Sequence, residues 1–260
     1  MMRVSDIVAA VEGFAPRSVQ EDWDNSGLCI GSPEDEVTGV LLALDCTPAL
    51  LDEAIATGAN MIVTHHPLIF KGLKRISEAD PVGATVIKAI RGGVAVYAAH
   101  TNADKVLGGV SWAMADKLGL SGAEVLDDEG GGIGLGVVGD LPFETDGLGA
   151  VDYVKKRFGL KALRCSKPLE TPFRRVAVCG GSGSSLLGSA ISSGASLYVT
   201  ADVTYHNFFT PEGFMVMDIG HFESEIEIVD ILFNVIRKKF PNFAVRISDN
   251  IRNSNPIYYF

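Results

Sequence analysis

The sequence predicts an α/β protein of two similar lobes, related by internal duplication, with a metal site in the cleft between them. Three observations lead to this prediction. Short apolar runs alternate with segments of helical period, one stretch of the chain repeats another, and metal-ligand residues follow the apolar runs. Because ligands of open α/β sheets bind beyond the carboxyl ends of strands, the third observation locates the site.

The first half of the chain is expected to form βα units. Short runs rich in Val, Leu, Ile and Ala predict strands over 40–45, 60–64 and 94–99. Apolar residues at helical spacing predict helices over 5–14, 48–57, 82–91 and 106–118. The alternation of the two patterns predicts a parallel sheet.

The second half shows the same alternation. Strands are expected over 175–179, 196–200 and 214–218, and helices over 184–193 and 222–239. A Gly-rich segment at 130–139 and a helix over 147–158 lie between the halves. We therefore predict an N-terminal lobe over 1–126 and a C-terminal lobe over 127–260, with 127–173 as a connecting region.

Two blocks of sequence indicate a duplication. A shift of 136 positions aligns Val40–Thr64 with Val176–Thr200 without a gap and gives nine identities in 25 positions. A shift of 121 aligns 94–104 with 215–225, so that His100 meets His221 and Asp104 meets Glu225. Any two βα units share some Val, Gly and Ala by composition alone. Two co-linear blocks with the same His-x-x-x-carboxylate end favour duplication.

Composition excludes several classes of protein. The chain has 260 residues, of which 47% are hydrophobic and 21% charged, which excludes a disordered or collagen-like protein. The 32 acidic residues outnumber the 22 basic ones and give a net charge of -10. An acidic surface repels phosphate backbones, so a nucleic-acid partner is not expected. Short basic clusters such as 71–75 are interpreted as solvated faces.

Cysteine spacing and apolar runs define the expected compartment. The four cysteines form no Cys-x-x-Cys pair, which argues against a zinc ribbon or a disulfide scaffold. Asp6 and Glu12 interrupt the apolar stretch that a signal peptide needs. No apolar run approaches the roughly 18 residues of a membrane span. We therefore expect a cytoplasmic protein with no membrane partner.

The histidines indicate a metal site. All five follow predicted strands: His65, His66, His100, His206 and His221. Asp104 and Glu225 come four residues after their histidines, a spacing that places both side chains on one face of a helix. Imidazole and carboxylate together suit Zn, Fe, Mn or Ni.

The adjacent pair His65-His66 favours two ions over one. A regular strand points neighbouring side chains to opposite faces, but at an irregular strand end they can straddle two ions. The expected ligands of the two divalent ions, with Glu225 as the bridge, are His65, His66, Asp104, His221 and Glu225. The alternative is structural: each histidine could bond in the core, Asp104 could cap a helix, and Glu225 could line a first turn.

Six motifs occur in a fixed order along the chain. They are TrpAspAsn at 23–25 with Gly27-Leu28, THHPLIF at 64–70, HTNAD at 100–104, GGSGSS at 180–185, TADVTYH at 200–206 and DIGHFESE at 218–225. From about residue 5 onward the chain resembles the dinuclear-metal proteins called GTP cyclohydrolase I type 2 or NIF-three-like. The resemblance implies two α/β lobes, a two-metal site with the five ligands above, and a toroidal homohexamer. It also implies that His100 and His206, our candidate catalytic residues, line the site without being standard ligands.

The sequence departs from the family pattern at two positions. Ala103 replaces a leucine, and Ala201 replaces a glycine, which could alter the backbone beside the site. The segment 127–173 is where longer members insert a further domain. GGSGSS lacks the Lys-Ser/Thr of a P-loop, so a tight turn is favoured over a phosphate site. Trp23 is either a core residue before a turn or part of the site.

Three functions are compatible with these residues. The first is a metal-dependent hydrolase that opens the guanine ring of GTP with metal-activated water, His100 or His206 transferring protons. The second is a nucleotide phosphohydrolase or phosphoesterase with the same centre. The third is a non-catalytic, metal-stabilised ring that binds a partner. We expect a small-molecule substrate, a nucleotide, in the first two cases.

Overall fold

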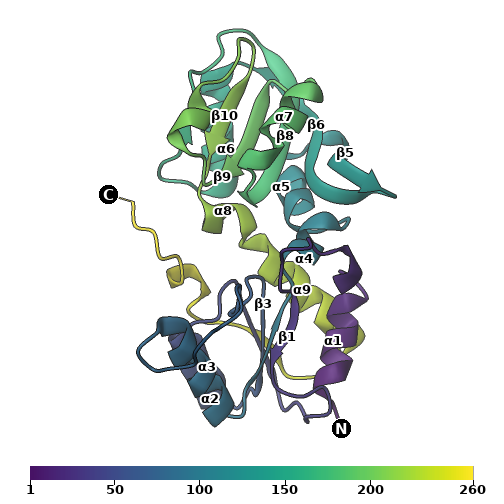
Figure 1. Ribbon diagram of the computed structural model, residues 1–260. Coiled ribbons are helices and arrows are strands. Elements are labelled where there is room, and N and C mark those ends of the chain that lie inside the picture. The colour runs from purple at the N-terminus through teal and green to yellow at the C-terminus, as the bar shows by residue number, and fades with distance from the viewer. Residues whose placement is uncertain (260) are drawn as a thin grey trace. The chain divides into compact units, whose positions relative to one another are not determined.

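The computed structural model describes residues 1–259, apart from the side chain of Arg252. It divides into two compact units. One comprises residues 1–103 and 228–256, and the other comprises residues 104–227 and the chain from Ile257 onward. Each unit holds one β-sheet with helices packed on it (Figure 1). The α/β fold class predicted from the sequence is therefore confirmed.

The first unit holds a five-stranded sheet in the order β1-β4-β3-β2-β11. Its strands are β1 (Gly27–Ile30), β2 (Val40–Ala43), β3 (Met61–Thr64), β4 (Ala95–Ala98) and β11 (Val245–Ile247). All neighbours are parallel except β1, which is antiparallel to β4. Every residue of β2, β3 and β4 is buried, as expected for parallel strands that are covered on both faces.

Helices cover both faces of this sheet. Figure 1 shows α2 and α3 on one face and α1 and α9 on the other. The helices are α1 (Val4–Glu12), α2 (Pro48–Thr57), α3 (Pro81–Arg91) and α9 (Glu227–Lys239), with short 3-10 turns at Arg17–Val19 and Ile251–Asn253. Thr47 and Asp80 cap α2 and α3, and a proline follows each cap. These start signals explain why α2 begins where the sequence predicts and α3 begins one residue earlier, at Pro81.

The second unit holds a six-stranded sheet in the order β5-β6-β8-β9-β10-β7. Its strands are β5 (Ser121–Gly130), β6 (Ile133–Thr145), β7 (Arg164–Cys165), β8 (Phe173–Ser182), β9 (Leu197–Ala201) and β10 (Met215–Asp218). The three strands β8, β9 and β10 are parallel, and the other pairs are antiparallel. The sheet is therefore a parallel centre with antiparallel edges.

The helices of the second unit separate onto two faces of its sheet. They are α4 (Thr101–Lys105), which spans the boundary between the units, α5 (Val110–Leu118), α6 (Gly147–Phe158), α7 (Leu187–Ser192) and α8 (His221–Glu225), with 3-10 turns at Ser184–Leu186 and Tyr205–Phe208. Residues of α5 and α6 share a core with Val176 and Val178 of β8. Residues of α7 share a second core with Ala177, on the opposite face of the same strand.

The duplication read from the sequence is present in the strand pairing. Strands β2, β3 and β4 neighbour one another in the same order and direction as β8, β9 and β10. Val40 pairs with Met61, and Val176 pairs with Leu197, so the shift of 136 positions preserves the register. The second block differs by one residue, because Leu197 pairs with Met215 whereas the repeat would set it beside Val216.

The division of the chain differs from the one expected at 126/127. The first unit is made of two separate stretches of the chain, residues 1–103 and 228–256. The second stretch belongs to it because β11 pairs with β2. The expected connecting region 127–173 holds β6 and α6, which belong to the second unit. The Gly-rich segment forms the turn and second strand of the β5–β6 hairpin.

The helix expected over 106–118 also begins later, at Val110. Gly108 adopts a φ of 79°, a left-handed conformation that interrupts a helix, so α4 and α5 are separate. Among the residues that the structure describes, no helix is both long and apolar enough to cross a bilayer.

Candidate metal sites

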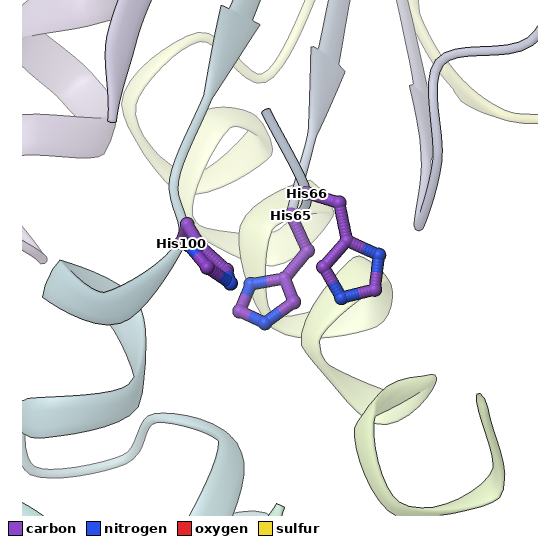
Figure 2. Close-up of side chains that lie close together, drawn as sticks. All are labelled: His65, His66 and His100. Carbon is purple, nitrogen blue, oxygen red and sulfur yellow. The ribbon is translucent and has the colours of Figure 1, made fainter. Parts of the chain in front are cut away.

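Three imidazoles gather at the carboxyl ends of two neighbouring strands of the first unit. His65 and His66 follow β3, and His100 follows β4 (Figure 2). Their ring centroids lie 5.0 to 5.6 Å apart, and one nitrogen of each lies within 4.8 Å of one nitrogen of the other two. We call these residues the histidine cluster. Its spacing is compatible with imidazoles that share a metal ion.

An irregular strand end brings the adjacent pair together. The Thr64 hydroxyl donates to the backbone oxygen of His66 at 2.8 Å, and the His66 N–H donates to Leu44 O at 3.0 Å. Pro67 follows and favours extended backbone at His66. The rings of His65 and His66, which a regular strand would point to opposite faces, are tilted by 48° and lie side by side.

Each ring of the cluster is held through its Nδ1 atom by an oxygen acceptor at 2.7 Å. The acceptors are the backbone oxygen of Ala99 for His65, Asp45 for His66 and Asp24 for His100. A carbonyl or carboxylate oxygen accepts and does not donate, so Nδ1 carries the proton. In the neutral imidazole the lone pair is then on Nε2. Histidines that bind metals in proteins show this arrangement.

Asp24 connects His100 to the loop before β1. Its carboxylate accepts from Thr101 Oγ1 at 2.5 Å and from Ser26 Oγ at 2.8 Å, as well as from His100. Burial opposes ionisation of this carboxyl group. The hydrogen bonds from His100, Thr101 and Ser26 outweigh it and hold the pKa of Asp24 well below its ordinary value. Asp24 is therefore an ionised acceptor that fixes the ring of His100.

A second cluster lies in the second unit and combines one imidazole with two carboxylates. His221 begins α8 and Glu225 ends it, with Nε2 of His221 3.0 Å from Oε2 of Glu225. Asp104, on α4, places a carboxylate oxygen within 4.8 Å of one on Glu225. Nδ1 of His221 contacts a carboxylate oxygen of Asp202 at 2.7 Å, so this ring too is held through Nδ1 by an oxygen acceptor. We call Asp104, His221 and Glu225 the carboxylate cluster.

Gly181, at the end of β8, gives Glu225 its room. A Cβ atom on Gly181 would lie 2.1 Å from Oε1 of Glu225, whereas one on the preceding Gly180 would instead meet Val110, 2.2 Å from its Cγ1. Gly181 also adopts a φ of 60°, and its N–H donates to Ser224 Oγ at 2.9 Å. The GGSGSS segment therefore ends β8, turns at Gly183 into the 3-10 turn Ser184–Leu186 and packs against α8, and its left-handed backbone favours glycine at position 181.

Ala201, which stands where the family pattern has glycine, does not adopt a left-handed backbone. Ala201 ends β9 and is buried. Among the described residues the only one other than glycine with a positive φ is its neighbour Asp202, at 52°. That conformation is uncommon and costs energy, although Asp tolerates it better than most residues. It accompanies the contact of Asp202 with His221.

Cysteine does not contribute to either cluster. The four thiols are free, and burial raises the pKa of Cys29 to about 11 and those of Cys46 and Cys179 to about 12. A thiol binds metal as the thiolate, which such pKa values disfavour at neutral pH. The donor set is therefore imidazole and carboxylate, which fits Zn, Fe, Mn or Ni as the sequence predicts.

Two residues singled out in the sequence lie outside these clusters. His206 is exposed in the 3-10 turn Tyr205–Phe208 and contacts the rings of Tyr205 and Phe209. Its proposed catalytic role stays a prediction. Trp23 is 59% exposed, so its interpretation as a core residue is wrong. Its ring lies 6.2 Å from that of His100.

The carboxylates that hold the histidines were not identified from the sequence. Asp45 and Asp202 come one or two residues after strands β2 and β9, at the edge where the histidines were sought. That position was the available signal. Asp24 lies in a loop 76 residues before its partner and does not follow a strand, so its only signal was the TrpAspAsn motif at 23–25.

We expect Asp45→Ala to weaken metal binding by about 10- to 100-fold, the usual cost of losing a hydrogen-bond partner of a ligand histidine. Without Asp45 the ring of His66 is no longer fixed in orientation or tautomer. Titration with Zn²⁺ against a competing chelator measures the change. Asp52→Ala removes an exposed carboxylate that pairs with Lys88 and is the control. Equal dissociation constants for the two variants would contradict a role for Asp45.

Comparison with known proteins extends over nearly the whole chain. The profile of the Duf34/NIF3 (NGG1p interacting factor 3) family matches residues 2–256. Proteins named GTP cyclohydrolase 1 type 2 homolog are 36% identical in Clostridium perfringens, over 86% of this chain and 87% of that protein, and 35% identical in Lactococcus lactis, over 99% of both. The crystal structure of a Bacillus cereus protein related to NIF3 has a TM-score of 0.91 at 25% identity, covering 99% of both chains. A Staphylococcus aureus structure has a TM-score of 0.91 at 27% identity, covering 100% of this chain and 99% of that one.

Proposed function

Because the chain belongs to the Duf34/NIF3 (NGG1p interacting factor 3) family, we propose that it is a metal-dependent hydrolase with a dinuclear centre. The proposed ligands are His65, His66, Asp104, His221 and Glu225. One observation carries this proposal. His65, His66 and His100 each donate through Nδ1 to an oxygen at 2.7 Å, so that in the neutral ring the lone pair is on Nε2.

A structural role for these histidines explains the observation less well. A core histidine needs one satisfied nitrogen, but nothing then requires three imidazoles within 4.8 Å of one another. Positive charge on such neighbours would be repulsive, so they are stable together as neutral rings or around a cation. The carboxylates Asp104 and Glu225 likewise repel one another unless a proton or a cation compensates them.

Divalent ions, when bound, supply Lewis acidity and make water acidic enough to react at neutral pH. The residues of the chain then have three tasks. His65 and His66 would hold the ions through their imidazoles, and Glu225 would hold them through its carboxylate as the expected bridging ligand. His100, fixed by Asp24, accepts or donates a proton at Nε2, for which an imidazole is suited near neutral pH. His206 is a second candidate for proton transfer.

We propose a nucleotide as the substrate, and GTP first, because two relatives are named GTP cyclohydrolase 1 type 2 homolog. Hydrolytic opening of the guanine ring adds one water at C8 and breaks the C8–N9 bond, which leaves a formamide on N7. A second water then cleaves the C8–N7 bond and releases the carbon as formate. Cleavage of a phosphate ester by the same ions would release phosphate instead. The two products distinguish the two reactions.

Metal-loaded protein is expected to release formate from GTP, and chelation of the metal is expected to stop it. Formate and phosphate are measured in the same reaction. Phosphate without formate would show a phosphohydrolase and contradict ring opening. Release of neither product by protein with bound metal would contradict hydrolysis and favour a binding role.

The same assay with His100→Ala tests whether His100 transfers a proton. Loss of a general acid or base typically slows a reaction by about 10²- to 10⁴-fold. Slower formate release at unchanged metal content would support proton transfer by His100, whereas loss of an ion would make it a ligand. We further propose, from the family resemblance alone, a cytoplasmic toroidal homohexamer.

A further inference from the structure

Two exposed aromatic side chains lie beside the histidine cluster. Trp23 is 59% exposed and Phe70 is 45% exposed, and their ring centroids are 5.8 Å apart with a tilt of 58°. Each ring is also edge-on to His100, at 6.2 Å for Trp23 and 6.1 Å for Phe70. We call Trp23 and Phe70 the aromatic corner. Exposed apolar groups that cluster in this way mark binding surfaces.

Hydrogen bonds hold the corner in place. Nδ2 of Asn25 donates to the backbone oxygen of Ile69 at 2.6 Å, which joins the loop of Trp23 to the loop of Phe70. Asp24 joins the same loop to His100 and Thr101. Both aromatic residues are therefore next to a residue that is fixed. A surface organised in advance loses little entropy when a ligand binds.

The segment after Phe70 adds positive charge to an acidic chain. Lys71, Lys74 and Arg75 are exposed, and the segment has no acidic residue before Glu78. Aromatic faces bind planar rings of any base by stacking, and lysine and arginine bind phosphate oxygens. A planar ring that carries phosphate matches both features, whereas an apolar partner matches only the first.

We propose that Trp23 and Phe70 bind the planar ring of a nucleotide beside His100, and that the exposed cations of the 71–75 segment bind its phosphates. This inference rests on the proposed function and names the residues that select the substrate. It predicts that the protein distinguishes ligands by their planar ring and not only by their phosphate chain. The phosphate chain alone should bind independently of Trp23.

Tryptophan fluorescence tests the proposal directly. The chain has two tryptophans, and Trp112 packs against the core of the second unit, so Trp112→Phe leaves Trp23 as the emitter. The metal-loaded variant is titrated with 7-deaza-GTP, whose ring lacks the imidazole that hydrolysis would open. We expect saturable quenching by 7-deaza-GTP and by 7-deazaguanosine, and none by inorganic triphosphate.

Calorimetry on the metal-loaded wild-type background gives the magnitude. Trp23→Ala is expected to weaken binding of 7-deaza-GTP by about 5- to 150-fold, the effect of losing one stacking partner, and to leave binding of triphosphate unchanged. Tyr258→Ala, which removes another exposed aromatic ring, is the matched control and should change neither.

Two results would overturn the proposal: no quenching by the nucleoside, or equal affinity of wild type and Trp23→Ala for 7-deaza-GTP. If the affinity is equal and the sedimentation of Trp23→Ala changes, the corner is a contact between copies of the chain. Nucleotide binding that depends on Trp23, without formate release, would contradict ring opening and support the aromatic corner as a binding site. Formate release together with unchanged affinity in Trp23→Ala would support the hydrolase and contradict the aromatic corner as a binding site.

Discussion

Replacing His65 with alanine is expected to weaken metal binding by more than the roughly 10- to 100-fold that loss of an outer hydrogen-bond partner costs. His65 is fully buried at the end of β3, and its Nδ1 is fixed by the backbone oxygen of Ala99. Its Nε2 is therefore presented in one orientation, and its removal takes one imidazole from the histidine cluster. Metal content after dialysis, measured by inductively coupled plasma mass spectrometry, reports the loss.

The control for His65→Ala is His206→Ala. His206 is exposed and lies outside both clusters, so its removal should leave the metal content unchanged. Truncation of a buried imidazole also leaves Ala99 O without its donor, which costs about 1–3 kcal/mol of stability. Thermal unfolding of both metal-free variants separates that cost from ligand loss. Equal metal content in the two folded variants would refute His65 as a ligand.

Replacing Gly181 with alanine is expected to reduce both stability and metal content. The added Cβ would lie 2.1 Å from Oε1 of Glu225, so the carboxylate or the turn after β8 must move. The left-handed backbone at φ 60° adds about 1–2 kcal/mol for any residue with a Cβ. Thermal unfolding without metal and metal content after dialysis measure the two effects separately.

Gly194→Ala is the matched control for this substitution. Gly194 has a φ of 77° in the same unit, but a Cβ there meets nothing within 4 Å. Both variants pay the cost of the left-handed backbone, and only Gly181→Ala displaces Glu225. The control should lose stability and keep its metal. If the two variants behave alike, the contact with Glu225 has no consequence for the site.

The parallel core of each sheet could be predicted because its signals are local. The runs that form β2, β3 and β4 are apolar throughout, and Thr47-Pro48 and Asp80-Pro81 mark the starts of the helices between them. The repeat extends the same prediction to β8 and β9.

The strands that were missed lack such signals. Most of β5 is exposed and acidic, with Asp127, Asp128 and Glu129 near its end, so it has no apolar alternation. β11 has only three residues, and it is defined by pairing with β2 about 200 positions away. Long-range pairing of this kind cannot be read from local composition.

The candidate site was partly predictable for the same reason. Histidines that directly follow apolar strands could be predicted to lie close together, because the carboxyl ends of parallel strands meet at one edge of the sheet. The acceptors that fix these rings are more distant, and Asp24 illustrates the difficulty. Its loop lies beside His100 because β1, which follows the loop, pairs antiparallel with β4, which precedes His100. The exposure of Trp23 and its proximity to Phe70 likewise depend on the folded loops.

The metal content of the wild-type chain is the most direct test of the account. The protein is prepared anaerobically, saturated with a single kind of divalent metal ion and dialysed. It is predicted to retain about two of these ions per chain, as expected of a two-metal site. The His65→Ala and Glu225→Ala variants, measured beside it, should each retain fewer. A folded wild-type chain that retains no divalent metal, or variants that retain as much as it does, would contradict the assignment of these side chains as ligands.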